Sequence, residues 1–169
     1  LIRRRISLPE DARILEIGCG TGHNLPMLGQ FGEVDAIEID AAPREMATRR
    51  LGKPVMAHPL PSLEGVADGA YDLVAILDVL EHVADPRHTL QQLHDRCEHN
   101  GLLVIAVPDR ESWDAEHYGP EWAAWDVPRH LSHFRRMDIK RLLGEVGFTF
   151  MESRKMWFDA PYVCMLSEQ

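Results

Sequence analysis

The sequence contains no long hydrophobic run. No apolar stretch in its 169 residues approaches the roughly 18 residues that a membrane-spanning helix needs. The opening residues, LIRRRISLPEDAR, turn polar too early to form the apolar segment of a signal peptide. These two absences predict a protein with no membrane span and a cytoplasmic location.

Cysteine is also scarce. Cys19, Cys97 and Cys164 are an odd number of thiols, and their spacing matches no metal-binding pattern. A disulfide framework is therefore not expected, and a reducing cytosolic setting fits best.

Positive charge is in the minority. The chain carries 18 Lys and Arg against 27 Asp and Glu, which gives a formal net charge of −9. This balance disfavours a nucleic-acid backbone as partner, and the short run Arg3–Arg5 does not reverse it. The sequence shows no internal repeat, low-complexity tract or linker, and 45% of its residues are hydrophobic. We expect a single domain over residues 1–169, and the sequence leaves its oligomeric state open.

Apolar runs alternate along the chain with segments of helical periodicity. The runs predict strands at 13–18, 34–40, 54–58, 71–77, 101–108 and 148–156, and the periodic segments predict helices at 24–32, 42–52, 85–97 and 137–147. Residues 109–135 carry no clear period and read as a long loop. This alternation predicts an α/β fold, a doubly wound and mostly parallel sheet with helices on both faces. Ligands of such folds bind at the carboxyl ends of the strands.

A glycine-rich turn follows the first predicted strand, in the stretch ILEIGCGTG at residues 14–22. A dinucleotide site needs G-x-G-x-x-G, but His23 stands where the third glycine would be. A Walker loop is excluded because no Gly-Lys-Ser/Thr follows. The remaining pattern, E-x-G-x-G-x-G, begins with Glu16, an acid that suits a cationic ligand better than a phosphate. Two more acids, Glu38 and Asp40, end the second predicted strand, where a carboxylate can accept hydrogen bonds from ribose hydroxyls.

Two later segments complete a recognisable order of motifs. DVLEHV lies at residues 78–83 and PRHLSHF at 128–134. Together with the glycine turn and the acid at Glu38, they resemble the class I S-adenosylmethionine-dependent methyltransferases. The resemblance covers roughly residues 12–157 and is strongest to the small-molecule branch that includes ubiquinone-biosynthesis O-methyltransferases.

The resemblance implies a Rossmann-like fold that moves a methyl group from S-adenosylmethionine to a small-molecule acceptor, with oxygen as the expected acceptor atom. A catalytically inactive S-adenosylmethionine-binding module and a nicotinamide-dependent reductase remain alternatives. The implied cofactor contacts are Glu16, Gly18, Cys19, Gly20, Gly22, Glu38, Ile39, Leu77, Asp78 and Val79. The family's seventh strand has little sequence left to form it, and residues 162–166 could supply either a stunted strand or the start of a helix.

The acceptor side is less defined by the sequence. His82 and His133 are the candidate general bases, because imidazole titrates near neutral pH. Trp122, Trp125 and His130 are expected to line the acceptor, although the tryptophans could equally pin the 109–135 loop to the core.

A metal site is a further possibility at the DVLEHV segment. Asp78, Glu81 and His82 match residues that hold a divalent metal in some ubiquinone-type relatives. We favour a metal-free interpretation, in which Asp78 lines the methionine end of the donor and Glu81 organises a helix start.

Overall fold

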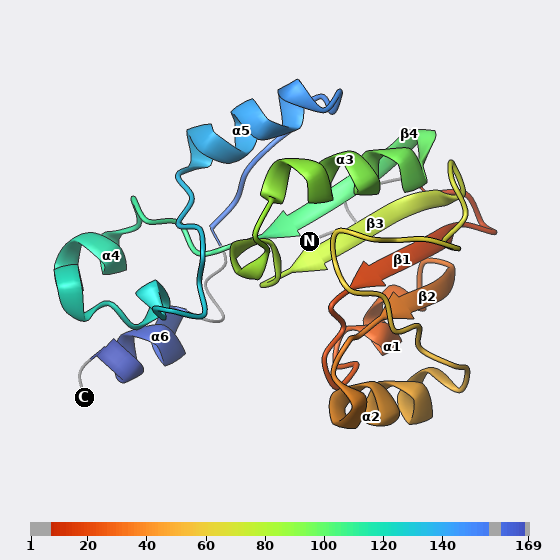
Figure 1. Ribbon diagram of the computed structural model, residues 1–169, viewed down its shortest axis with the longest axis horizontal. Helices are drawn as coiled ribbons and strands as arrows, with labels where there is room; N and C mark the ends of the chain where they lie inside the picture. The colour runs from red at the N-terminus through yellow and green to blue at the C-terminus, as the bar shows by residue number, and fades with distance from the viewer. Residues whose placement is uncertain (1–7, 156–159, 168–169) are drawn as a thin grey trace.

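The computed structural model describes residues 8–155 and 160–167. Its centre is a parallel sheet of four strands, β1 (Arg13–Ile17), β2 (Glu33–Ile37), β3 (Tyr71–Leu77) and β4 (Cys97–Ala106), in the order β2-β1-β3-β4 (Figure 1). The chain winds outward from β1 to β2 in one direction and from β3 to β4 in the other. The carboxyl ends of β1 and β3 therefore form the switch point where such folds bind ligands. The predicted α/β class is confirmed.

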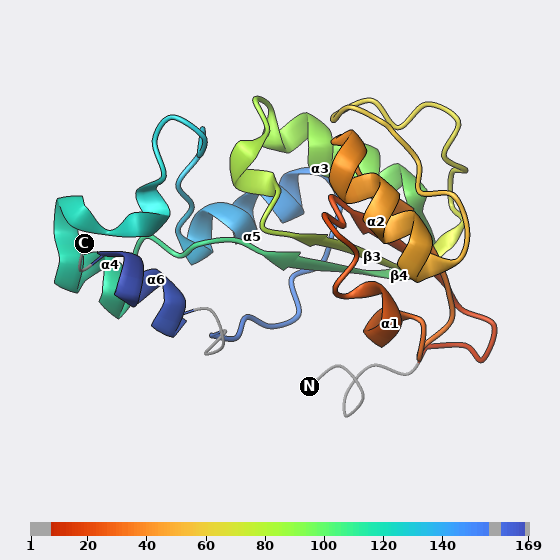
Figure 2. The ribbon, with the colours of Figure 1, turned by 90° about the horizontal axis from the view of Figure 1, so that it is seen from below.

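Helices connect and follow the strands. They are α1 (Leu25–Leu28), α2 (Ala41–Leu51), α3 (Pro86–Arg96), α4 (Trp113–Tyr118), α5 (Arg136–Glu145) and α6 (Ala160–Ser167), with short 3₁₀ turns η2 (Leu80–His82), η3 (Gly119–Glu121) and η4 (Ala123–Trp125). Figure 2 shows helices on both sides of the sheet. No helix within the described residues is both long and apolar enough to cross a membrane.

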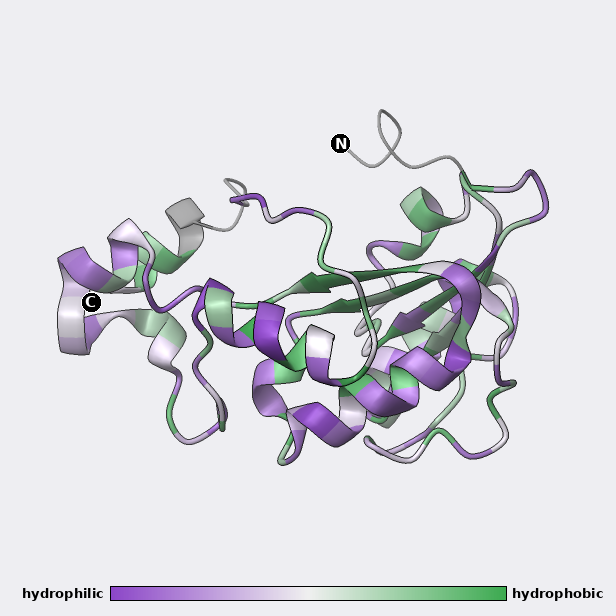
Figure 3. Ribbon diagram, turned by 90° about the horizontal axis from the view of Figure 1, so that it is seen from above, coloured by the Kyte–Doolittle hydropathy of each residue, from purple (hydrophilic) through white to green (hydrophobic). Residues whose placement is uncertain are grey.

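The sheet separates two apolar clusters. Leu15 and Ile76 belong to the cluster that contains Leu90 and Leu93 of α3, whereas Ile14 and Leu73 belong to the cluster with Leu25 and Leu28 of α1. Neighbouring residues of one strand enter opposite clusters because successive side chains of a strand point to opposite faces. The hydrophobic colouring in Figure 3 is correspondingly concentrated in the central strands.

Local chemistry explains where several helices begin and end. The Asp85 side chain accepts a hydrogen bond from the backbone N–H of His88 and so caps α3, with Pro86 at its first position. Gly52 ends α2 in the left-handed region. The first helix is shorter than predicted and stops at Leu28. Gly32 is required for another reason, since a Cβ there would lie 2.0 Å from the carbonyl oxygen of Ala12.

Two predicted strands are wrong. Residues 54–58 contribute a single bridge, between Met56 and Ile37, because the prolines at 54, 59 and 61 cannot donate to a ladder. Residues 148–155 form no strand. Phe148 and Phe150 pack against the core, so apolar burial rather than strand pairing explains their pattern. Residue 156 lies outside the described residues.

The region predicted as a loop is also more structured than expected. Residues 109–135 contain α4, η3 and η4, and the Ser112 side chain caps α4 by accepting from Ala115 N–H. Residues 162–166 are helical rather than a stunted strand. They lie in α6, whose Ser167 Oγ accepts a hydrogen bond from Ala123 N–H, so that α6 packs beside η4 (Figure 1).

Candidate functional site

The glycine turn lies at the carboxyl end of β1. Gly18, Gly20 and Gly22 all have positive φ, at 67°, 53° and 81°. A Cβ at Gly18 would lie 2.3 Å from Val79 Cγ2, and one at Gly22 would lie 2.8 Å from Leu25 Cδ1. A Cβ at Gly20 would meet no described atom within 4 Å. Packing thus explains the outer two glycines, whereas Gly20 presents bare backbone to open space.

Glu38 ties the end of β2 to this turn. Its Oε2 accepts a hydrogen bond from Gly20 N–H at 2.8 Å, and its Oε1 accepts one from Asp40 N–H at 2.9 Å. Arg44 on α2 donates to the carbonyl oxygens of Glu38 and Ile39. The Glu38 side chain is consequently fixed and buried, while Ile39 and Asp40 are exposed. The sequence did not indicate a role for Arg44, because a single basic residue on a predicted helix does not show which carbonyl oxygens it will contact.

Glu16 is a buried acid beside the same turn. It is 1% exposed, and its Oε1 accepts a hydrogen bond from Asn24 Nδ2 at 3.0 Å. Its Oε2 has no hydrogen-bond partner among the described residues. Burial raises the pKa of Glu16, against the hydrogen bond from Asn24, which lowers it. A buried carboxylate oxygen that lacks a donor favours the approach of a cationic or hydrogen-bonding ligand. Asn24 was not anticipated from the sequence.

The end of β3 completes the switch point. Asp78 follows Leu77 in the left-handed region, with φ 54°, and its N–H donates to Ala106 O. Val79 then packs its side chain against Gly18. The residues predicted at Leu77, Asp78 and Val79 therefore lie next to the glycine turn.

The DVLEHV segment (78–83) and the PRHLSHF segment (128–134), although far apart in the sequence, are in contact. The carbonyl oxygen of Glu81 accepts hydrogen bonds from Leu131 N–H at 2.8 Å and Ser132 N–H at 3.1 Å. His82 Nδ1 lies 3.0 Å from the carbonyl oxygen of Arg129. The chain from residue 129 to 132 is thereby fixed along η2, just beyond the carboxyl end of β3.

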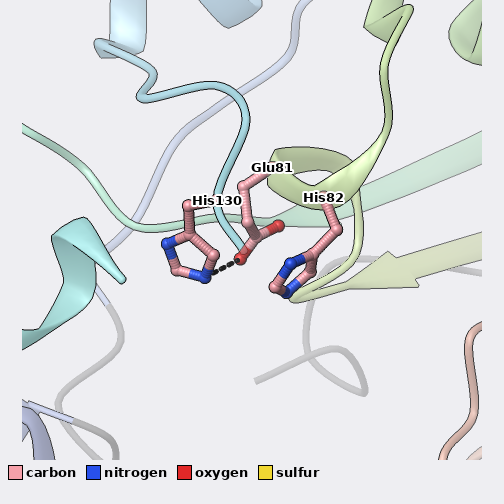
Figure 4. A group of neighbouring side chains, drawn as sticks. All are labelled: Glu81, His82 and His130. Atoms are coloured by element: carbon pink, nitrogen blue, oxygen red, sulfur yellow. Dashed lines mark ion pairs between the residues drawn. The ribbon is translucent and has the colours of Figure 1, made fainter. Parts of the chain in front are cut away.

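Histidine side chains gather at this contact. His130 Nδ1 lies 2.8 Å from Ala124 O, and its Nε2 lies 3.9 Å from Glu81 Oε1 (Figure 4). The rings of His82 and His130 meet edge-on, with centroids 4.6 Å apart. Burial raises the pKa of Glu81 to about 7, and burial lowers the pKa of His130. Because His130 lies 48 or more positions from Glu81 and His82, sequence spacing gave no signal of its approach to them.

The aromatic residues divide into two groups. Trp122 is buried, and Trp125 Nε1 donates to Gly119 O at 2.7 Å. His133 Nε2 in turn lies 2.7 Å from Trp125 O. Trp113 is 62% exposed and stacks on His117. Trp122 packs in a small cluster with Ala115 and Ala124, separate from the two clusters that flank the sheet.

Comparisons with known proteins agree with this geometry. A family model described as a methyltransferase domain matches residues 1–153. The ubiquinone biosynthesis O-methyltransferase of Cereibacter sphaeroides is 30% identical over 171 residues, which cover 92% of this chain and 69% of the relative. That of Azorhizobium caulinodans is 26% identical over 159 residues, which cover 87% of this chain and 62% of the relative. The chain thus spans about two thirds of the length of these relatives.

A solved structure shares the fold. It is a methyltransferase from Thermotoga maritima described as a possible histamine N-methyltransferase, with a TM-score of 0.70 and 24% identity. The match covers 85% of this chain and 66% of that one.

Proposed function

The chain belongs to the methyltransferase domain family, within the class I S-adenosylmethionine-dependent methyltransferases, and we propose from this premise that it methylates a small-molecule hydroxyl. The observation that carries the proposal is the pairing of Gly20 with Glu38. An open stretch of backbone lies directly beside a fixed, buried carboxylate, at the switch point of the sheet. This arrangement suits a nucleoside whose ribose lies against the turn.

The ribose diol would donate to Glu38. Each carboxylate oxygen already accepts one backbone N–H, and each has further acceptor capacity for a hydroxyl. The unpartnered Oε2 of Glu16 would receive the ammonium group of the donor's methionine moiety. The remaining donor contacts in the proposal are Gly18, Cys19, Gly22, Ile39, Leu77, Asp78 and Val79.

Methyl transfer from a sulfonium needs little chemistry from the protein. The donor is already reactive, so alignment of acceptor, methyl and sulfur with exclusion of water supplies most of the catalysis. Cys19 is not a covalent nucleophile in this scheme. Burial and the charges of Glu16 and Glu38 raise the pKa of the Cys19 thiol to about 12, so the reactive thiolate is absent near neutral pH.

A hydroxyl acceptor gains from a base, and His82 is our candidate. A carbonyl has no proton to give, so the contact with Arg129 O requires the proton on Nδ1. The lone pair of His82 then lies on Nε2 and can take the acceptor's proton. His133 is the second candidate, because its Nε2 lies 2.7 Å from Trp125 O and by the same argument its lone pair lies on Nδ1.

We take oxygen as the acceptor atom because the relatives from Azorhizobium caulinodans and Cereibacter sphaeroides are named O-methyltransferases. Trp125 and His130 would lie toward the acceptor, with Trp122 behind them. The three unpaired cysteines suit a reducing, cytoplasmic setting for the reaction.

Turnover with labelled S-adenosylmethionine tests the proposal. A panel of phenols, sugars, carboxylic acids and amines is incubated with the chain, and labelled product and S-adenosylhomocysteine are quantified by mass spectrometry. We expect both products with at least one hydroxyl compound. Donor binding without turnover across the panel would instead favour a binding module, and methylation confined to amines would contradict an oxygen acceptor.

A further inference from the structure

The side chain of Arg44 contacts two successive backbone groups just beyond the end of β2. Its Nη1 atom donates to the carbonyl oxygens of Glu38 and Ile39, at 3.0 and 2.5 Å. Both carbonyls follow Ile37, the last residue of β2 that pairs with β1. Arg44 therefore supplies the N–H group that a neighbouring strand supplies within the sheet. We infer that Arg44 is a positioning residue, which sets the affinity for the ribose of S-adenosylmethionine through Glu38.

The other polar groups of Glu38 are also held by the protein. Its carboxylate accepts hydrogen bonds from Gly20 N–H at 2.8 Å and from Asp40 N–H at 2.9 Å. Its own N–H donates to Met56 O at 3.0 Å. With Arg44 on the carbonyl oxygen, the backbone and the carboxylate of Glu38 are oriented by the protein itself. A carboxylate that is oriented beforehand loses little freedom when ribose hydroxyls bind to it, and this favours affinity.

The place of Arg44 on α2 brings its guanidinium to this segment. The helix begins at Ala41, and the half-buried side chain of Arg44 comes from its first turn. Arg49 lies later on the same helix and pairs instead with Glu45, with a side chain that is 72% exposed. A guanidinium stays protonated throughout the physiological pH range, so the two contacts of Arg44 persist there. The two arginines thus differ in what they hold, although they share one helix.

The first measurement uses no ligand, although the inference as a whole rests on the S-adenosylmethionine site proposed above. The amide protons of Gly20 and Asp40 donate to the Glu38 carboxylate, so NMR of these amides reports its position. Arg44→Met keeps an unbranched stem and removes every N–H group of the guanidinium. We expect both amide resonances to shift and their exchange with solvent to become roughly 3- to 30-fold faster, because the residues share one hydrogen-bond network.

The second measurement compares S-adenosylhomocysteine with its dideoxy analogue, which lacks both ribose hydroxyls. Arg44→Met should weaken calorimetric binding of S-adenosylhomocysteine roughly 3- to 30-fold. Binding of the analogue, measured by competition, should change by less than about twofold, because the analogue has no hydroxyl to place against Glu38. Arg44→Lys should give intermediate values, since a single nitrogen makes both contacts and an ammonium group also has several N–H donors.

Arg49→Met is the matched control, because it removes a cation from the same helix and interrupts the pair with Glu45. It should match the wild type in both measurements. Variants are compared only if they unfold cooperatively, and Arg44→Lys carries the test if Arg44→Met does not fold.

Two results would overturn the inference alone. One is normal S-adenosylhomocysteine binding with unchanged Gly20 and Asp40 amides in Arg44→Met. The other is equal weakening of both ligands, which would make Arg44 a structural residue. Absence of S-adenosylhomocysteine binding by the wild type would instead overturn the proposed S-adenosylmethionine site, and this inference with it.

Discussion

Replacement of Gly20 by alanine separates donor binding from folding. At φ 53° an L-residue is strained, which costs about 1–2 kcal/mol. A Cβ at this position meets no described atom, so this strain is the main cost to the fold. For a chain of this size it should lower the melting temperature by roughly 2–8 °C. The added methyl occupies the space assigned to the donor, and overpacking of about 1–3 kcal/mol would weaken binding roughly 5- to 150-fold.

Gly69→Ala is the matched control. Gly69 has φ 58°, and its Cβ would also meet no described atom within 4 Å, but it precedes β3 at the opposite edge of the sheet. Both variants should therefore melt at similar temperatures, and Gly69→Ala should bind like the wild type. Gly18→Ala should be clearly less stable than either, because its Cβ would lie 2.3 Å from Val79 Cγ2.

The assay combines calorimetric titration of S-adenosylhomocysteine with thermal unfolding followed by circular dichroism. Equal dissociation constants for Gly20→Ala and Gly69→Ala would refute the assignment of the donor to the glycine turn. Loss of cooperative unfolding in Gly20→Ala but not in Gly69→Ala would refute the interpretation that the space beside the Gly20 backbone is unoccupied by the protein.

Three further predictions concern individual side chains. Glu38→Gln should weaken S-adenosylhomocysteine binding roughly 10- to 150-fold, because hydrogen bonds to a charged group contribute about 1.5–3 kcal/mol; an unchanged calorimetric constant would remove Glu38 from the ribose site. His82→Gln should lower kcat ~10²- to 10⁴-fold with donor affinity retained, and His133→Gln should lower it less; the reverse order in a turnover assay would make His133 the base. Burial alone would raise the pKa of Asp35, but hydrogen bonds led by that from Lys53 lower it overall. Asp35 therefore stabilises the fold above its unfolded pKa, and this contribution is lost as pH falls through the lower folded value. Asp35→Asn should cost about 1 kcal/mol at pH 7 and progressively less below about pH 4, and a constant difference in urea unfolding across this range would contradict the pairing.

The elements that the sequence predicted well are those decided by local chemistry. Strands β1 and β3 are buried apolar runs, and α3 begins where Asp85 and Pro86 require it. The region around 148–155 was misjudged because a strand needs a pairing partner, which its own residues do not supply. Phe148 and Phe150 are partly buried because they pack against the core, without strand pairing.

The residues of the candidate site also divide into those that local sequence identifies and those that tertiary packing brings together. Gly20 and Glu38 lie 18 residues apart, and each was identified from its own segment at the end of a predicted strand. The approach of His130 to Glu81 depends on how residues 113–125 fold and on where the following chain crosses η2. That geometry arises from tertiary packing, so no spacing rule could have found it.

The most direct test of the donor site is a crystal structure of the chain with S-adenosylhomocysteine. We expect the ribose hydroxyls within hydrogen-bond distance of the Glu38 carboxylate, the nucleoside over Gly20, and the sulfur directed toward the end of β3 and His82. A nucleoside bound away from the carboxyl ends of β1 and β3, or a ribose that leaves Glu38 uncontacted, would contradict the account.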